Sequence, residues 1–184
     1  MKKFSTLILV LFILSSFACE TALCEGYGGV IMKYCSIKGQ SGLMGGGEGA
    51  LIINKNFIFG ATGVTLVSGV KASEFDSGNI GNLALSYSGL KVGYIINPED
   101  VNHFIVHCLF GAGSLGYTNG GTSDRSNIAV IEPGIDNEID VMSIMRICFG
   151  VSYRVVTGVS DTPGLSNDYL SNFAVNFTFK WGAF

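Results

Sequence analysis

The sequence predicts an all-β fold, an antiparallel up-and-down β-barrel of about eight strands that spans a membrane. Segments near the C-terminal end alternate between bulky apolar residues and small or polar ones, the pattern of strands with two different faces. The chain is 48% hydrophobic and 14% charged and holds 26 glycines, but beyond its first residues no apolar run is long enough for a spanning helix. Strands that face lipid carry their hydrophobicity in alternation, so a membrane barrel accounts for both observations.

The first 24 residues are expected to be a signal peptide and leader, outside the fold. Two lysines precede the apolar run Leu7–Leu14, which is far shorter than the roughly 20 residues of a spanning helix. Cleavage is therefore expected between residues 18 and 24, and lipidation of Cys19 remains an open alternative to ordinary cleavage. Residues 25–184 then form a single domain, the barrel.

Strand positions follow from the alternation, counted back from the C-terminal end. We predict strands at residues 28–37, 42–53, 57–68, 82–96, 103–117, 127–138, 144–157 and 172–183. The last two run to about 11 residues, the length that a tilted strand needs to cross hydrocarbon. Longer connections rich in Gly, Ser, Asn and Asp alternate with short turns, as in a barrel with loops at one end and turns at the other. Only the first connection of the loop set, 38–41, is tight.

The second, third and fourth strands are less regular. Glycines at 42, 45, 46, 47, 49, 60 and 63 interrupt the alternation, which suits the sharp curvature of a small barrel, although a glycine-rich soluble sheet is an alternative. In the fourth strand Leu83, Leu85 and Tyr87 share one face, whereas Leu90, Val92, Tyr94 and Ile96 take the other. We therefore expect a β-bulge near Ser88–Gly89 that restores the phase.

The polar face of the sixth and seventh strands carries acids and arginines that would project into the lumen. These residues are Glu132, Asp136, Glu138, Arg146 and Arg154. Buried charges need partners, and Arg can bond a carboxylate at two points, so we predict a paired network that fills the lumen. An open pore is not expected, because an eight-strand interior is just wide enough for side chains to fill. Depending on register, the network would also include Lys33, Glu48, Lys91 and His107.

The apolar face of the same region is expected to form a lipid-facing belt. Its members are Phe149, Tyr153, Phe173, Phe177, Phe179 and Trp181. If these side chains instead pointed inward around a cavity, the chain would be a soluble, exported, lipocalin-like barrel that binds a lipid or another apolar ligand.

A resemblance supports the barrel. The stretch Glu132-Pro133-Gly134, followed by Glu138, Asp140-Val141, Arg146, Gly150 and Tyr153-Arg154, resembles small outer-membrane β-barrel proteins of Bacteroidetes-type bacteria. The segments Ile52–Phe57 and Phe177–Phe184 look like the same family. The resemblance implies a barrel in the bacterial outer membrane and no activity. A terminal aromatic is typical of chains handled by the barrel assembly machinery, so Phe184 is the expected assembly signal, although it shares the parity of Lys180 and Gly182.

Other function classes find little support in the sequence. The net charge is −3 without a basic cluster, so no nucleic-acid partner is expected. The five cysteines show no disulfide framework or metal-binding spacing, and we expect no metal and no cofactor. The expected partners are outer-membrane lipids and, during biogenesis, the assembly machinery, with the barrel itself a monomer.

An enzyme is not expected, because the GxSxG and HExxH motifs are missing. A hydrolase at the barrel rim is a weaker alternative that would need His103 or His107 as its base, and we interpret both as solvated or core residues. The acidic connections around Glu74, Asp76, Asp161 and Asp168 are expected to stay solvated.

Overall fold

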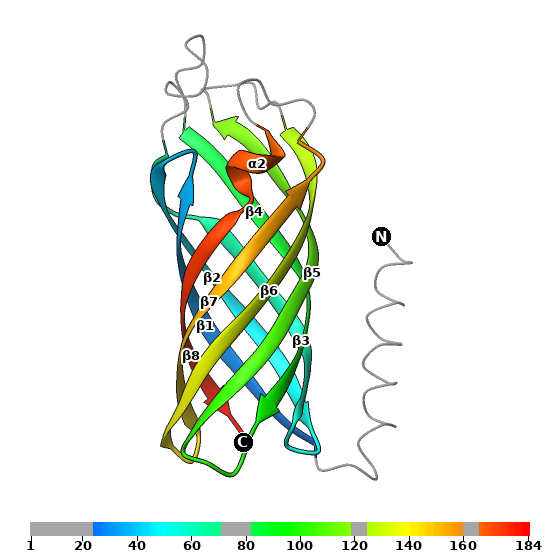
Figure 1. Ribbon diagram of the computed structural model, residues 1–184, viewed down its shortest axis with the longest axis vertical. Helices are drawn as coiled ribbons and strands as arrows, with labels where there is room; N and C mark the ends of the chain where they lie inside the picture. Colours follow the sequence, from blue (N-terminus) through cyan, green and yellow to red (C-terminus); the bar gives the residue numbers. More distant parts are fainter. Residues whose placement is uncertain (1–23, 71–81, 119–124, 160–165) are drawn as a thin grey trace.

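A computed structural model shows a closed barrel in which each strand pairs antiparallel with its neighbours in sequence and β1 pairs with β8 (Figure 1). The structure describes residues 24–70, 82–118, 125–159 and 166–184. The strands are β1 (Cys24–Ile37), β2 (Gln40–Ile53), β3 (Phe57–Leu66), β4 (Asn82–Ile96), β5 (Asn102–Thr118), β6 (Arg125–Met142), β7 (Met145–Thr157) and β8 (Asn172–Gly182). The predicted all-β class, an antiparallel up-and-down barrel of eight strands, is confirmed.

The two ends of the barrel differ. The turns after β2, β4 and β6 lie at the same end as the C-terminus, which we call the turn end, and the other connections lie at the loop end (Figure 1). The tight connection between β1 and β2 is a two-residue turn in which Lys38 and Gly39 have φ values of 49° and 84°. Positive φ at both positions matches the twist of a hairpin, so this connection needs no longer loop. Residues 1–23, which include the expected signal peptide and Cys19, lie outside the described part.

The expected bulge in β4 is wrong. β4 pairs with β5 without a register shift from Asn82 opposite Thr118 to Ile96 opposite Phe104, and its pairing with β3 is equally regular. Leu83, Leu85 and Tyr87 point into the lumen, whereas Leu90, Val92, Tyr94 and Ile96 point outward. The apolar residues change face because part of the barrel interior is apolar, while the strand itself continues without an extra residue.

The lumen has an apolar region toward the loop end. Side chains from all eight strands and from a short helix, α2 (Asn167–Leu170), pack together there. The prediction treated residues 158–171 as loop only, yet Leu170 of α2 is completely buried in this cluster. Figure 1 shows α2 at the loop end of the barrel. A smaller apolar cluster toward the turn end consists of Tyr27, Ala50, Ile52, Ile58, Ile95 and Ile105.

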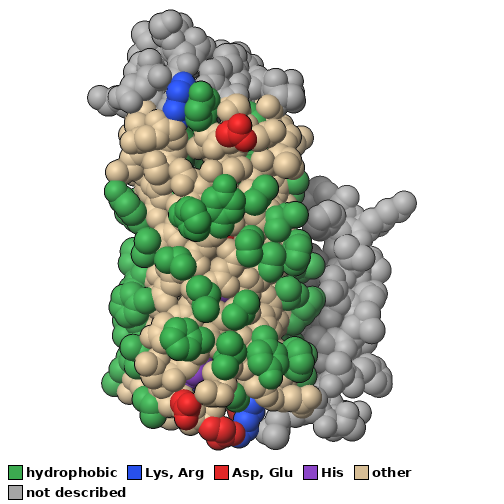
Figure 2. Space-filling view, in the orientation of Figure 1, with side chains coloured by type: hydrophobic (Ala, Val, Ile, Leu, Met, Phe, Trp, Pro, Cys, Tyr) green, Lys and Arg blue, Asp and Glu red, His purple; other side chains and the backbone are tan. Residues whose placement is uncertain are grey.

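The outer wall is apolar between the two ends. Figure 2 shows hydrophobic side chains over the middle of one face of the barrel and charged ones near its ends. At strand positions whose side chains the structure describes, no outward-facing residue is charged. Many are large and substantially exposed, among them Phe110, Phe149, Val151, Phe173 and Val175. No helix in the described part of the chain is long and apolar enough to cross a membrane.

Candidate functional site

The candidate site is a set of charged side chains inside the barrel, arranged around four buried carboxylates. Three of them, Glu132, Asp136 and Glu138, come from β6, where even-numbered residues face the lumen. The fourth, Glu48, comes from β2. All four are at most 7% exposed, so each depends on partners inside the barrel.

Glu132 is saturated by partners from three strands. Lys33 contacts Glu132 Oε1 at 2.5 Å, and Ser152 donates to the same oxygen at 2.5 Å. Tyr87 donates its hydroxyl to Glu132 Oε2 at 2.6 Å. Asn176 extends the cluster by donating to Ser152 Oγ at 3.2 Å. Both oxygens of this carboxylate are therefore occupied without an arginine.

Arg154 does not pair with Glu132, which corrects the prediction for this residue. Arg154 is 1% exposed, and its Nε donates to the carbonyl of Leu170 in α2 at 2.9 Å. Its other nitrogens lie near Met44 Sδ and Cys35 Sγ, at 3.1 and 3.9 Å. Lys33 and Ser152 occupy the nearest carboxylate, and the long guanidinium side chain reaches the loop end instead. Arg154 thus holds α2 in the mouth of the barrel.

Replacing Arg154 with Met is expected to loosen α2 while the barrel stays closed. A hydrogen bond to a charged group contributes about 1.5–3 kcal/mol, so local opening should become at least about tenfold more frequent. Amide hydrogen exchange at Tyr169 and Ser171, whose amides bond to Ser166 and Asn167, measures this opening. Unchanged exchange rates in a folded Arg154→Met barrel would show that Arg154 does not hold α2 in place.

Glu138 is the centre of the largest cluster, near the turn end. Lys180 contacts Glu138 Oε2 at 2.5 Å, and Arg146 donates to Oε1 at 3.0 Å. His103 Nε2 lies 3.0 Å from Oε1, and the Cys148 thiol donates to Oε2 at 2.9 Å. The sequence predicted that acids of β6 would pair with arginines of β7 inside the barrel. The contact between Glu138 and Arg146 is such a pair.

Arg146 also links this cluster to the rim of the barrel. Its Nε lies 2.7 Å from Oδ1 of Asp140, the residue opposite it on β6. Atoms of His103, Glu138 and Asp140 lie within 4.8 Å of one another, a spacing that suits a metal ion. The Arg146 guanidinium contacts both carboxylates, however, so the positive charge that such a donor set would take is already supplied by the protein.

A third cluster joins Glu48 and Asp136 through a lysine. Lys91 contacts Glu48 Oε2 at 2.8 Å and lies 4.0 Å from Asp136 Oδ2. Thr62 donates to Glu48 Oε2 at 3.5 Å. His107 Nε2 lies 3.0 Å from Asp136 Oδ2. Lys91 thus sits between two carboxylates that belong to opposite walls of the barrel.

The six aromatic residues predicted for the lipid-facing belt lie on the outer surface of β7 and β8. They form ring pairs: Tyr153 with Phe173 at 4.8 Å, Phe149 with Phe177 at 4.9 Å, and Phe179 with Phe177 and with Trp181, each at 5.5 Å. Phe177 and Phe179 are half-buried by these neighbours. The set is a ladder along two adjacent strands. Since it points outward, these rings do not line an internal ligand cavity.

Phe184 closes part of the turn end. Its ring lies 4.2 Å from the Arg146 guanidinium carbon and stacks on Tyr27 with centroids 5.8 Å apart. Phe184 shares the parity of Lys180 and Gly182 in the sequence, and in the structure its ring packs against the smaller apolar cluster toward the turn end. A pocket of about 260 Å³ at this end is lined by Phe184, Arg146 and Asp140 together with residues of the turns.

An exposed ion pair joins two turns at this end. Lys55 Nζ contacts Glu99 Oε1 at 2.7 Å, and both side chains are largely exposed. The hydrogen bond from Lys55 lowers the pKa of Glu99 and raises the pKa of Lys55. Because the pKa of Glu99 is lower in the folded protein, the pair stabilises the fold above the ordinary Glu pKa, and this contribution is lost as the pH falls through the folded value.

We expect an NMR titration to show the Glu99 carboxyl ionising below its ordinary range. In a Lys55→Met variant the Glu99 pKa should return toward that range, since the donor is gone. The effect should shrink in high salt, because both groups are in water. Identical Glu99 titrations in the two proteins would contradict the pairing.

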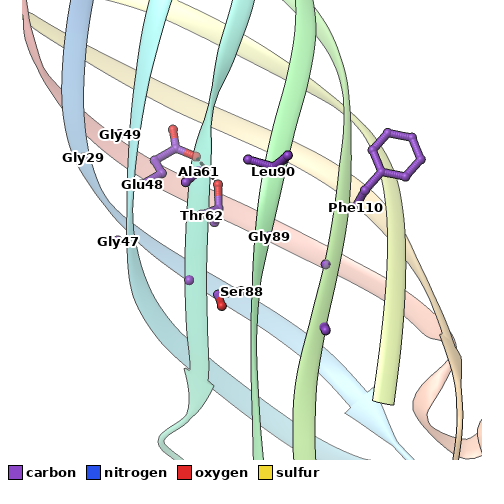
Figure 3. A pocket seen from close by; sticks show the side chains of 13 residues that line it. Gly29, Gly47, Glu48, Gly49, Ala61, Thr62, Ser88, Gly89, Leu90 and Phe110 are labelled. Carbon is purple, nitrogen blue, oxygen red and sulfur yellow. Dashed lines mark hydrogen bonds between the residues drawn. The ribbon is translucent and has the colours of Figure 1, made fainter. Parts of the chain in front are cut away.

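A broad hollow lies on the outer side of β1 to β5 (Figure 3). Its volume is about 740 Å³, and Leu90 and Phe110 lie among its lining residues. The outward positions that form its floor carry only small side chains: Gly47, Gly49, Ala61, Gly63, Ser88 and Ala112. These outward-facing residues are uncharged, so the hollow continues the apolar wall.

Sequence reasoning left some members of the lumen clusters out. Lys180 was not included, although it shares the inward parity of Asn176 and Thr178 and alternation could have placed it. His103 was interpreted as a solvated or core residue, and its contact with Glu138 follows from the β5–β6 register, in which the two residues are opposite each other. Neither His103 nor His107 has a serine among its hydrogen-bond partners in the described residues. Asp168 is exposed on α2, whereas Glu74, Asp76 and Asp161 lie outside the described part.

Comparison with known proteins identifies the fold. No family model and no curated protein matches the sequence. The N-terminal β-barrel domain of Pseudomonas aeruginosa OprF aligns with a TM-score of 0.63 at 8% identity, over 88% of this chain and 99% of that one. Neisserial surface protein A aligns with a TM-score of 0.64 at 11% identity, over 89% and 99%. Ail of Yersinia pestis gives 0.50 at 10%, over 86% and 95%. These neighbours are small eight-stranded outer-membrane β-barrels.

Proposed function

We propose that this chain is a structural protein of the bacterial outer membrane, a monomeric β-barrel with a side-chain-filled lumen, exposed loops and no catalytic activity. The observation that carries the proposal is the inverted distribution of charge. The buried charged side chains lie inside the barrel, while the described outward positions of the strands are uncharged. In water such a wall would expose a large apolar surface, whereas in a bilayer it meets hydrocarbon.

The filled lumen is argued from its contents. Ion-paired side chains occupy the middle and the turn end, and an apolar cluster with α2 occupies the loop end. A continuous water path would have to cross that apolar cluster. An eight-strand barrel leaves little space beyond its side chains, so we expect no stable ion conductance.

Location and biogenesis follow from the same proposal. The partners would be outer-membrane lipids around the wall and the barrel assembly machinery, with Phe184 as part of the assembly signal and a cleaved signal peptide for export. The solved neighbours support an outer-membrane barrel in general. Kinship with the Bacteroidetes-type barrels rests on the sequence resemblance. The lipocalin-like alternative is disfavoured because the aromatic ladder lies outside the barrel.

The test is fractionation of cells that express the full chain, followed by gel electrophoresis of boiled and unboiled samples. A heat-modifiable band in the outer-membrane fraction is expected, since a closed barrel resists detergent until it is heated. Recovery of the protein as a soluble periplasmic species would overturn the proposal. Purified protein in planar bilayers should show no steady conductance, and a regular open channel would contradict the filled lumen.

A further inference from the structure

Unpartnered polar atoms are concentrated at one place inside the barrel. In the described part of the chain, Glu48 Oε1, Asp136 Oδ1 and His107 Nδ1 are buried and have no partner, and His107 Nε2 has only its 3.0 Å contact with Asp136 Oδ2. Outside this group, only Tyr27 Oη and Asp140 Oδ1 share that status among the described side chains, and Asp140 Oδ1 lies 2.7 Å from Arg146 Nε. Native proteins rarely leave buried acceptors unpaired, so three such residues together indicate a missing partner.

Glu48, Asp136 and His107 all line one small internal cavity. The other lining residues include Thr62, Lys91, Lys33 and Glu132. The space open to the centre of a water molecule is about 10 Å³. A single water fills roughly 10–15 Å³ as a probe sphere, so the cavity has room for a water and is too small for an organic ligand.

Two glycines make room for the residues that face this cavity. A Cβ on Gly134 would lie 2.7 Å from His107 Cε1, and a Cβ on Gly150 would lie 1.8 Å from Asp136 Oδ1. The backbone offers little relief at Gly150, because the same Cβ would lie 2.5 Å from the carbonyl oxygen of Ile135. The positions of His107 and Asp136 therefore depend on the glycines of β6 and β7.

We propose that this cavity is a binding site for one ordered water molecule that bridges Glu48 and Asp136. The water would donate its two hydrogens to Glu48 Oε1 and Asp136 Oδ1, the two free carboxylate oxygens. Its lone pairs would accept from the ammonium group of Lys91 or Lys33, or from His107 in a tautomer that donates at Nδ1. One water molecule would then provide a hydrogen-bond donor to each of the two unpaired carboxylate oxygens.

The same water would connect two charged clusters. Lys33 and Glu132 belong to the cluster toward the loop end, and Glu48, Lys91 and Asp136 belong to the next one. Because all five residues line the cavity, a water there completes one hydrogen-bonded network across the barrel. A metal or alkali cation fits less well, since the Lys91 ammonium already lies between the two carboxylates.

A crystal structure of the mature protein at about 1.8 Å or better tests the site, with a second crystal soaked in thallium(I) as a cation probe. We expect a water peak within hydrogen-bond distance of Glu48 Oε1 and Asp136 Oδ1, and no anomalous peak from thallium. An empty cavity, with these oxygens bonded to other side chains, would overturn the proposal. A thallium peak at the site would equally overturn it in favour of a cation.

A matched pair of variants tests the same point in a folded barrel. Glu48→Gln keeps an oxygen acceptor and the volume of the side chain, so the water peak should persist. Glu48→Leu removes the acceptor, and the peak should disappear while heat-modifiable mobility reports whether the barrel is folded. Persistence of an unchanged peak in a folded Glu48→Leu barrel would show that Glu48 does not bind the water.

Discussion

Replacing Glu138 with Ala is expected to destabilise the barrel by about 3–5 kcal/mol, the cost of leaving a buried charge without its partner. Lys180 is 1% exposed, and Glu138 is its carboxylate partner in the described structure. Arg146 would keep Asp140, but Lys180 would be left beside the ring of Tyr27 with an uncompensated charge. The loss therefore arises mainly at Lys180.

Urea unfolding of the refolded protein, followed by the gel mobility of folded and unfolded forms, measures this loss. Glu99→Gln is the matched control, because Glu99 is an acid at the surface and the loss of its ion pair with Lys55 should cost at most about 1 kcal/mol. The double variant Glu138→Leu/Lys180→Met should recover part of the stability, since it removes the orphaned charge with its partner. If Glu138→Ala behaves like Glu99→Gln, the lumen cluster is not a stabilising network.

Val151→Arg is expected to cost about 2–4 kcal/mol in a bilayer, the penalty for a cation at the midplane of a lipid-facing strand. Val151 is at the centre of β7, points outward and is 49% exposed. Its neighbours in the pairing are Ile135 on β6 and Val175 on β8, both apolar and exposed. An arginine there would face hydrocarbon on every side.

Thr157→Arg provides the matched control, because Thr157 is also exposed but lies at the loop end of the same strand. Near the interface the penalty falls to about 0–1 kcal/mol. Folding into lipid vesicles over a range of urea concentrations measures the free energy of folding of both variants. In a protein whose wall faces water the two variants would behave alike, within about 0.5 kcal/mol of the parent, and that result would contradict a lipid-facing wall.

The alternation of apolar and polar residues was enough to predict most of the fold. The predicted ranges lie within the observed strands or overrun them by one or two residues, as at 57–68 against Phe57–Leu66. β6 was the least accurate, at 127–138 against Arg125–Met142. The inward parity of β6 and β7 also placed Glu132, Glu138 and Arg146 correctly, because one face of each strand carries the charges.

The contents of the lumen were harder to predict, since an interior can be polar or apolar. The assumption that apolar residues face lipid throughout led to the expected bulge near Ser88–Gly89. In the structure, Leu83, Leu85 and Tyr87 face an apolar interior at the loop end. The partner of Arg154 was missed for a related reason, because it is a backbone carbonyl in α2 and no side-chain pattern reveals it.

The central claim, that the outer wall contacts lipid, is tested most directly by the fluorescence of the single tryptophan of the chain, Trp181. Trp181 is 47% exposed on the outer face of β8, near the turn end. The measurement is quenching in vesicles whose acyl chains carry bromine at a defined depth. We expect strong quenching and blue-shifted emission, most pronounced with bromines close to the headgroups. Emission typical of water, with no effect of brominated lipid on the folded protein, would contradict the account.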